Sequence, residues 1–399
     1  MDLMQTPNAN RLQIGIFGSV NTGKSTLFNA LIKQNLSVVS DVEGTTTDAN
    51  KKAIEIHGIG PCLFIDTAGF DDNQSEIGKL RIEKTLEVAK SVDVAIIVFE
   101  NDDNLDFENY EKWIDYFNKK QVPIISVIGK TDIKEPSQDK LKKIKKVFEL
   151  ETILFNKNKS ECIKLIENKL IQYKLSEKKF PITSDFINSQ DTVLLVMPQD
   201  KEAPKGRLIL PQVQVLRELI DRNCTVLCCN LLSLEKTLKE LKKSPTAIIT
   251  DSKVIKSVVL KVPKDSKLST FSILFAKSKG DIKYFTESAK AISTLNDGDK
   301  ILISELCSHV PIEEDIGRVK IPKLLEKKTG KKLNFEILSG VDFPNDLKKY
   351  ALIIQCGGCV VNKRTIDERL KLAKSQNIPL TNYGVAIAYC TDTLDFIKF

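Results

Sequence analysis

The chain has 399 residues, nine cysteines, 42% apolar residues and a net charge of +7, which predicts a globular protein of two or three domains. No apolar run reaches the roughly 20 residues needed to cross a bilayer, only a short polar stretch precedes the first expected strand, and the lysines alternate with glutamates without the aromatic residues of a nucleic-acid platform. We therefore expect a cytoplasmic protein that binds neither membrane nor nucleic acid, in which an odd number of cysteines favours thiols and metal over disulfides.

A phosphate-binding loop opens the chain. Residues 11–17 (RLQIGIF) predict a buried strand and residues 26–33 a helix, with GSVNTGKS at 18–25 between them. This is the P-loop pattern in its required strand–loop–helix context. Its glycines let backbone N–H groups surround the β-phosphate, Lys24 reaches the β- and γ-phosphates, and the Ser25 hydroxyl coordinates Mg²⁺. The expected nucleotide contacts here are Gly18, Asn21, Thr22, Gly23, Lys24, Ser25 and Thr26.

Two later stretches indicate the switch loops of a GTP-hydrolysing domain. Thr46 lies in EGTTTD at 43–48, in the position where a threonine hydroxyl binds Mg²⁺ in the triphosphate state. Asp66 and Gly69 follow the next expected strand and offer a carboxylate to the water shell of Mg²⁺ and an N–H group to the γ-phosphate. Together with Lys24 these residues form the expected catalytic set.

These residues resemble the TrmE-Era group of small GTPases. In that group the asparagine at the position of Asn21 helps to bind a potassium ion beside the phosphates. Phe70 follows DTAG at 66–69, where Ras-like enzymes place the glutamine that orients water. The resemblance implies conversion of GTP to GDP and phosphate that is slow unless potassium is present.

The motif that reads the base is imperfect. After an expected strand at 123–128 the chain has Gly129, Lys130, a threonine and Asp132, where the family pattern is Asn-Lys-x-Asp. Asp132 can accept hydrogen bonds from guanine N1–H and N2–H, and the stem of Lys130 can cover the ring. Gly129 removes the usual asparagine amide, and FNKNKS at 155–160 is no clean match to the later Ser-Ala loop. We expect GTP rather than ATP, with weaker affinity or selectivity than the complete motif gives.

A polar linker near 174–181 separates the N-terminal region from a middle region that is expected to form a small α/β domain. The expected strands are 192–197, 225–229 and 246–250, and the expected helices are 213–220 and 231–241. So few residues bury little core alone, which favours a surface covered by a second copy of the chain. Packing against a neighbouring domain is the alternative.

Strands and helices continue to alternate in the C-terminal region, which predicts a mainly parallel sheet. The expected strands are 270–276, 301–304, 334–338 and 351–354, the expected helices are 281–295 and 365–375, and a turn at 382–384 leads into the apolar run 385–389.

Three cysteines each follow an expected strand of this sheet, so Cys307 and the pair Cys356 and Cys359 are expected at its C-terminal edge. The glycines of the Cys-x-x-Cys loop let backbone N–H groups face the sulfurs. Three thiolates with one exchangeable ligand suit a [4Fe-4S] cluster, while a structural zinc ion or no metal are the alternatives. The remaining cysteines are expected in the core, namely Cys62, Cys162, Cys224, Cys228, Cys229 and Cys390.

Five segments together resemble the HydF family of [FeFe]-hydrogenase maturation GTPases, in the same order and over essentially the whole chain. They are APKGRLILPQVQ at 203–214, CSH at 307–309, DIGRVKIP at 315–322, CGGC at 356–359 and NYGVAIAY at 382–389. The family pattern is Cys-x-His, a long spacer, then His-Cys-x-x-Cys, and this chain has Gln355 in place of the second histidine. The fourth ligand is therefore open among His309, water and a carboxylate such as Asp200.

The resemblance implies an α/β protein with a P-loop GTPase domain (1–173), a small α/β dimerisation domain (180–262) and a C-terminal α/β iron–sulfur cluster domain (263–399). It implies a scaffold that receives a diiron precursor made with radical SAM maturases, delivers it to apo-[FeFe]-hydrogenase and forms a homodimer or higher homo-oligomer. The alternatives are an RNA- or ribosome-associated GTPase with structural zinc, and a cluster-dependent redox enzyme for which no substrate motif is found.

Overall fold

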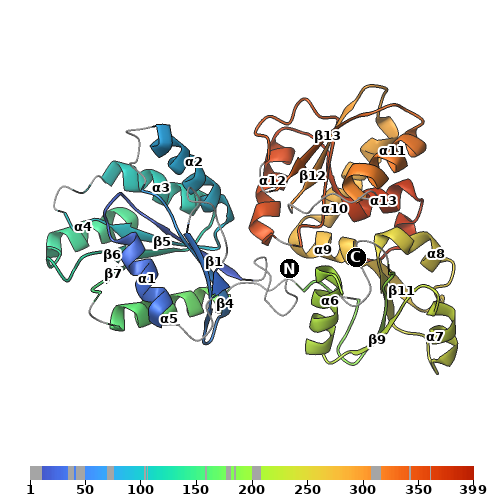
Figure 1. Ribbon diagram of the computed structural model, residues 1–399, viewed down its shortest axis with the longest axis horizontal. Coiled ribbons are helices and arrows are strands. Elements are labelled where there is room, and N and C mark those ends of the chain that lie inside the picture. The colour runs from blue at the N-terminus through green and yellow to red at the C-terminus, as the bar shows by residue number, and fades with distance from the viewer. Residues whose placement is uncertain are drawn as a thin grey trace. The chain divides into compact units, whose positions relative to one another are not determined.

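The structure is a computed structural model, and it describes residues 11–34, 40–41, 50–69, 76–102, 105, 107–157, 160–176, 181–183, 186–199, 208–306, 316–340, 343–359 and 361–399. It divides into two compact units, residues 1–178 and 179–399 (Figure 1). Within the described ranges, no helix combines the length and the apolar character needed to cross a membrane.

The first unit is built on a seven-stranded sheet in the order β2-β3-β4-β1-β5-β6-β7, parallel except where β2 and β3 pair antiparallel with their neighbours. Its strands are β1 (Leu12–Phe17), β2 (Ser40–Asp41), β3 (Asn50–Ile56), β4 (Gly60–Asp66), β5 (Val94–Phe99), β6 (Ile124–Ile128) and β7 (Thr152–Leu154). Its helices are α1 (Lys24–Gln34), α2 (Glu76–Ser91), α3 (Phe107–Lys119), α4 (Gln138–Phe148) and α5 (Glu161–Ser176).

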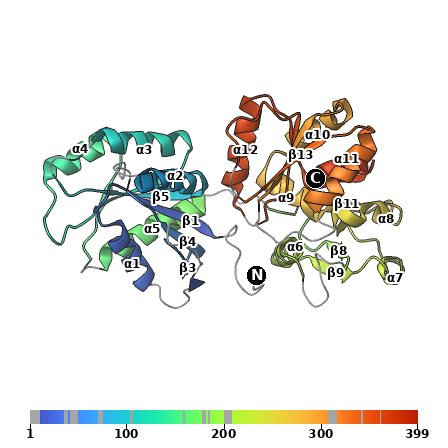
Figure 2. The same ribbon diagram turned by 45° about the horizontal axis from the view of Figure 1, so that its top comes forward.

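Helices cover both faces of this sheet, which is why its central strands are apolar throughout rather than alternating. Every residue of β1 is buried, as is every residue of β5. One face packs on α1 and α5 and the other on α2, α3 and α4 (Figure 2). The phosphate loop therefore starts from a strand that is fixed on both sides, as the sequence predicts.

The second unit contains two parallel sheets, in the orders β11-β10-β8-β9 and β13-β12-β14-β15. The strands are β8 (Thr192–Val196), β9 (Thr225–Cys229), β10 (Ala247–Thr250), β11 (Lys267–Thr270), β12 (Lys300–Glu305), β13 (Asn334–Ser339), β14 (Leu352–Gln355) and β15 (Leu380–Asn382). The helices include α6 (Leu210–Asp221), α7 (Leu234–Glu240), α8 (Ile255–Val259), α9 (Phe271–Lys279), α10 (Ile282–Ala289), α11 (Ile321–Thr329), α12 (Lys363–Ser375) and α13 (Tyr383–Cys390).

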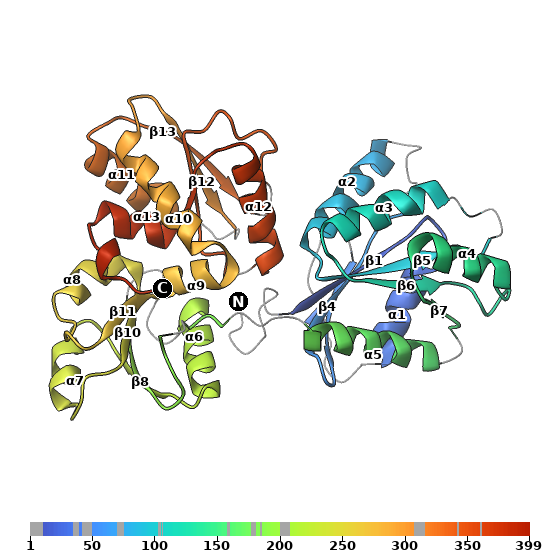
Figure 3. The same ribbon diagram turned by 180° about the vertical axis from the view of Figure 1, so that it is seen from behind.

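These two sheets share one hydrophobic core rather than packing as separate bodies. Leu194 and Ile248 from the first sheet belong to the same buried cluster as Ile301 and Ile353 from the second. On the second sheet, α11 and α13 lie on one side and α12 on the other (Figures 1 and 3). The proposed boundary between residues 262 and 263 stays a prediction, and β11, which follows it, pairs with β10.

The strand expected at 270–276 is wrong. The chain forms β11 up to Thr270 and then enters α9, because the Thr270 hydroxyl accepts a hydrogen bond of 3.2 Å from the backbone N–H of Ile273 and caps the helix. The helix that begins at Phe271 is buried on almost all sides, so its sequence lacks the alternation of apolar and polar residues every three to four positions that usually identifies a helix.

The apolar run at 385–389 is likewise helical, as part of α13. The side chain of Asn382 accepts a hydrogen bond of 2.8 Å from the backbone N–H of Gly384, at the start of this helix. A Cβ atom on Gly384 would lie 2.6 Å from the Cβ of Ser272. The glycine is therefore a close-packing residue between α13 and α9 rather than part of a turn.

Of the cysteines expected in the core, Cys62 and Cys162 are buried as predicted. Cys228 is exposed, and three others are only half-buried, namely Cys224, Cys229 and Cys390. Cys228 lies on β9, an edge strand with a partner on one side only. Its neighbours along the strand are exposed or half-buried. An edge strand of this kind presents unpaired backbone groups to any second chain.

Candidate functional site

The phosphate loop has the backbone geometry that its glycines predict. Gly18 has φ +150°, and a Cβ atom there would lie 2.3 Å from the carbonyl oxygen of Val98. Gly23 has φ +100° and Asn21 has φ +63°, conformations that favour glycine and, among other residues, asparagine. The loop therefore turns sharply against the end of β5 and leads into α1.

Lys24 lies back along this loop. Its Nζ donates a hydrogen bond of 2.6 Å to the carbonyl oxygen of Ser19, and the hydroxyl of Thr22 donates to the same oxygen at 3.1 Å. Lys24 and Thr22 are buried, whereas Ser25 and Thr26 at the start of α1 are exposed. The lysine side chain is thus held against the main chain of the loop itself.

Asp66 ends β4 beside Lys24 and Ser25. Burial raises its pKa, while a hydrogen bond with Ser25 and the charge of Lys24 act to lower it. Its Oδ1 is buried without a hydrogen-bond partner among the described residues. A buried carboxylate oxygen left open beside a lysine and a serine hydroxyl fits a place in the water shell of Mg²⁺. Gly69 is buried three residues further on.

The segment that should read the base lies against the phosphate loop. A Cβ atom on Gly129 would be only 2.0 Å from the carbonyl oxygen of Thr22. Lys130 has φ +57°, and its Cγ is 3.9 Å from where a Cβ of Gly23 would be. Asp132 forms an ion pair of 3.3 Å with Lys157. No motif in the sequence marks Lys157, because the loop after β7 matches no known pattern.

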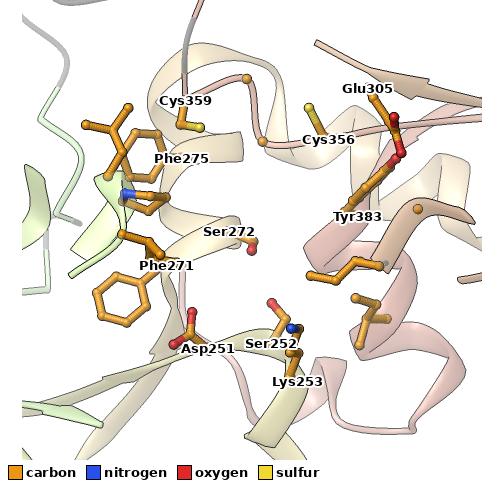
Figure 4. Close-up of a pocket in the computed structure, with 18 of the residues that line it drawn as sticks. Asp251, Ser252, Lys253, Phe271, Ser272, Phe275, Glu305, Cys356, Cys359 and Tyr383 are labelled. Atoms are coloured by element: carbon orange, nitrogen blue, oxygen red, sulfur yellow. The ribbon is translucent and has the colours of Figure 1, made fainter. Parts of the chain in front are cut away.

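A second candidate site lies within the second unit, where Cys356 and Cys359 line a cavity of about 330 Å³. Figure 4 shows both sulfurs at one end of this cavity and Asp251, Ser252 and Lys253 at the other. Its walls come from both sheets of the unit. They are formed by Pro198, Ile209, Leu210, Pro211, Asp251, Ser252, Lys253, Phe271, Ser272, Phe275, Glu305, Ile316, Gly317, Cys356, Gly357, Gly358, Cys359, Tyr383 and Ile387.

Backbone and cation contacts hold the Cys-x-x-Cys loop in place. The Sγ of Cys356 accepts a hydrogen bond of 3.1 Å from the backbone N–H of Leu306, which follows β12, so the ends of β12 and β14 meet as predicted. Lys279 donates hydrogen bonds of 2.7 Å to the carbonyl oxygens of Gly358 and Val361. Burial lowers the pKa of Lys279 to about 8, although the nearby cysteines oppose that shift.

The wall beside Cys356 carries a buried carboxylate. Glu305 is 2% exposed, and its Oε2 accepts hydrogen bonds from Arg318 at 3.2 Å and from Ser339 at 2.8 Å. Its Oε1 has no hydrogen-bond partner among the described residues. A Cβ atom on Gly317 would lie 2.8 Å from this Oε1 and 2.3 Å from the hydroxyl of Tyr383. Only a glycine leaves room for these two oxygens.

Several predicted ligands cannot be placed. Thr46, Asp200, Cys307 and His309 lie outside the described residues. Within the described part of the chain, no three histidine, cysteine, aspartate or glutamate side chains are grouped as a metal site would require. Gln355, the substitute for the second histidine of the family pattern, is 1% exposed and does not line the cavity.

Among curated proteins, the first unit is similar to bacterial GTPases. The tRNA modification GTPase MnmE of Treponema denticola is 33% identical over 160 residues, which are 39% of this chain and 34% of that protein. GTPase Der of Campylobacter concisus is 40% identical over 124 residues, which are 31% of this chain and 26% of that protein. The chain thus spans about a third of the length of the curated relatives it matches.

Among solved structures, Era of Aquifex aeolicus bound to GDP·AlF4⁻ matches 55% of this chain and 92% of that chain, with 19% identity and a TM-score of 0.33. The cytosolic domain of FeoB from L. pneumophila matches 40% of this chain and 63% of that chain, with 19% identity and a TM-score of 0.32.

Family models account for most of the chain in consecutive pieces. Residues 13–130 match the 50S ribosome-binding GTPase model, which agrees with the P-loop fold of the first unit. Residues 182–280 match the hydrogen maturase F dimerization domain, and residues 283–397 match the hydrogen maturase F tetramerization domain. The latter two cover nearly all of the second unit and include the cavity with its paired cysteines. The chain therefore belongs to the HydF family of hydrogenase maturation GTPases, with a TrmE-Era-like GTPase domain at its N-terminus.

Proposed function

We propose that the protein is a GTP-hydrolysing scaffold that helps to assemble the diiron subcluster of the [FeFe]-hydrogenase active site and delivers it to the apo-hydrogenase. In this proposal Cys307, Cys356 and Cys359 hold a [4Fe-4S] cluster whose fourth ligand is exchangeable. The observation that supports it is the pair of cysteines facing a cavity of about 330 Å³ at the C-terminal edge of a parallel sheet.

The donor set suits such a group. A backbone N–H of Leu306 already donates to the sulfur of Cys356, the type of contact that stabilises thiolate ligands of iron. Lys279 places a half-buried positive charge under the same loop, which favours the anionic state of thiolates. When bound, the cluster would supply an iron atom with a replaceable ligand. His309, water and Asp200 remain the candidates for that ligand.

The cavity extends beyond the two sulfurs, as a carrier requires. Phe271 and Phe275 provide an apolar wall, while Glu305 and Tyr383 provide polar groups on the other side (Figure 4). A partly apolar cavity with a few convergent polar groups is the usual form of a small-ligand site. We assign this space to the iron precursor, which the scaffold would receive from radical SAM maturases.

The GTPase part of the proposal rests on the geometry of the phosphate loop. Ser25 and Thr46 would coordinate Mg²⁺, Asp66 would bind its water shell, and Asn21 would bind a potassium ion that stimulates hydrolysis. Ordering of the Thr46 and Gly69 loops by GTP, and their release after hydrolysis, would change the affinity for partners. Equal affinity for maturases and hydrogenase with GTP, GDP and no nucleotide would refute this switching role.

The position of β9 at the edge of its sheet supports assembly of the chain with a second copy. A half-buried edge strand, in the part that matches a dimerization domain, can pair with its own copy across a twofold axis. We propose a homodimer or higher homo-oligomer in the cytoplasm.

The cluster assignment is tested by anaerobic reconstitution of the purified full chain with iron and sulfide, followed by reduction and EPR spectroscopy. A [4Fe-4S] signal that is lost in Cys356→Ala and kept in Cys228→Ala supports the assignment, because Cys228 is an exposed cysteine away from the cavity. Transfer of the diiron unit to apo-hydrogenase is then the activity to measure. Absence of a cluster, with zinc retained by the paired cysteines, would contradict the assignment and favour a structural-zinc GTPase.

A further inference from the structure

We infer that Glu305 is a specificity-determining residue of the cavity in the second unit, where its Oε1 accepts a hydrogen bond from the bound molecule. The class of ligand is a molecule that presents an N–H or O–H group beside Cys356. This role rests on the proposed cluster at the paired cysteines and goes beyond it, because it concerns which molecules the cavity takes next to the cluster.

Glu305 and Cys356 are neighbours on two adjacent parallel strands. β12 pairs with β14 so that Ser304 lies opposite Gln355, and the backbone N–H of Cys356 donates to the carbonyl oxygen of Ser304 at 2.9 Å. The next residue along each strand is Glu305 or Cys356, and both line the cavity. Figure 4 shows the carboxylate on the same side of the cavity as the sulfur of Cys356. A molecule held at this cysteine is therefore adjacent to the carboxylate.

The two oxygens of this carboxylate have different surroundings. Oε2 accepts hydrogen bonds from Arg318 at 3.2 Å and from Ser339 at 2.8 Å, whereas Oε1 has no hydrogen-bond partner among the residues that the structure describes. The residue is only 2% exposed, so bulk solvent offers little compensation. Leaving a buried, charged acceptor open is costly. An ion pair that served folding alone is expected to satisfy both oxygens, and a donor on a ligand would satisfy the second one.

One turn of the chain both holds the carboxylate and leaves room at Oε1. Ile316–Lys320 is a π-helical turn, a form that is frequent at functional sites. Its Arg318 pairs with Oε2. At the preceding residue, Gly317, a Cβ atom would lie 2.8 Å from Oε1 and 2.3 Å from the hydroxyl of Tyr383. Any larger residue there would press on both oxygens, so the turn fixes one side of the carboxylate and keeps the other accessible from the cavity.

The open oxygen selects ligands by the polarity of their hydrogen-bonding groups. A carboxylate only accepts, so Oε1 attracts N–H and O–H groups and repels groups that carry lone pairs alone, such as ethers and other carboxylates. Phe271 and Phe275 on the apolar wall of the cavity offer no competing side-chain hydrogen bond. A hydrogen bond in such surroundings is stronger than the same bond in water. The presence or absence of one donor on the ligand should therefore change its affinity measurably.

The test uses imidazole and 1-methylimidazole as probes of the full chain after anaerobic reconstitution with iron and sulfide. Both probes can coordinate iron through one ring nitrogen, but only imidazole carries an N–H group on the other nitrogen. The reduced protein is titrated with each probe at one alkaline pH, where both rings are neutral, and binding is followed by EPR spectroscopy. We expect the wild type to bind imidazole about tenfold more tightly, the usual size for one hydrogen bond to a charged group.

Glu305→Gln should abolish this preference and leave the affinity for 1-methylimidazole unchanged. Arg318 and Ser339 would hold the amide oxygen of the glutamine, so its amino group would take the place of Oε1 and donate instead of accepting. Glu336→Gln is the matched control, because Glu336 is a carboxylate on the neighbouring strand β13 that pairs with Lys300 at 2.7 Å and does not line the cavity. It should keep the wild-type preference.

The same preference for imidazole in Glu305→Gln as in the wild type would overturn the inference. So would the absence of a preference in the wild type, a result that stands even if Glu305→Gln fails to fold. Glu305→Asp is a second variant that keeps the charge but withdraws the carboxylate by one methylene, and it should weaken the preference as well. Absence of a cluster signal in the wild type would contradict the proposed function and this role with it, whereas a normal signal without the preference would overturn this role alone.

Discussion

Removal of the positive charge under the Cys-x-x-Cys loop should loosen that loop far more than it destabilises the fold. In Lys279→Met, the carbonyl oxygens of Gly358 and Val361 lose donors at 2.7 Å. Two hydrogen bonds from a charged donor contribute about 1.5–3 kcal/mol each. Against this, burial lowers the pKa of Lys279 from 10.5 to about 8, and holding the charge therefore costs about 3 kcal/mol.

These opposing contributions leave a net loss of about 0–3 kcal/mol in the free energy of unfolding of the second unit at pH 7. The measurement is denaturant unfolding followed by circular dichroism, with backbone hydrogen exchange of residues 356–361. Exchange there should rise clearly. The only tryptophan, Trp113, lies in the first unit, so its fluorescence transition should not move and serves as an internal control.

Lys283→Met, which removes an exposed lysine on the neighbouring helix, is the matched control and should leave both observables unchanged. The reasoning would be refuted by a loss above about 4 kcal/mol, since the charge would then not be costly to bury. Unchanged exchange at residues 356–361 would refute it as well, because the lysine would then not hold the loop.

Two further predictions concern other buried or capped groups. Tyr110→Phe should lower the stability of the first unit by about 1–3 kcal/mol and weaken GDP binding, because the fully buried hydroxyl donates to the carbonyl oxygen of Val98 at 3.1 Å beside the phosphate loop; unchanged melting and affinity would contradict this. The pKa of Asp281 is lowered by hydrogen bonds with Lys374 and with the N–H of Tyr284, so its contribution is complete above about pH 4 and is lost as the pH falls through the lowered pKa. Asp281→Asn keeps the helix cap, so it should be less stable than the wild type by at most about 1 kcal/mol at pH 7. The difference should shrink steadily as the pH falls below about 4, and a difference that stays constant on acidification would contradict the assignment.

The phosphate loop could be predicted closely because its chemistry is local. Gly18, Gly23 and Lys24 lie within one short loop, so spacing in the sequence fixes spacing in the fold. The same holds for the meeting of strand ends before Cys356, because neighbouring parallel strands end at one edge of a sheet.

Contacts between distant segments could not be predicted in this way. The sequence reveals that an asparagine is missing at Gly129, but not that the position touches Thr22. Nothing in its surroundings marks Lys279 as the donor to a loop about eighty residues away. The run beginning at Phe271 predicts a strand wrongly, because a helix buried on almost all sides loses the amphipathic pattern that identifies helices.

The common core of the two sheets in the second unit limits how the protein can be divided. Leu194 and Ile248 pack with residues of the other sheet, and the cavity takes one wall from each. A fragment that begins at residue 283 would keep Cys356 and Cys359 but lose Phe271, Phe275 and Asp251 from the cavity. The remaining sheet would also expose to water apolar side chains that are buried against the other sheet in the whole chain. The two domains of the second unit therefore have to be kept together, because replacing either one would change the walls of the cavity.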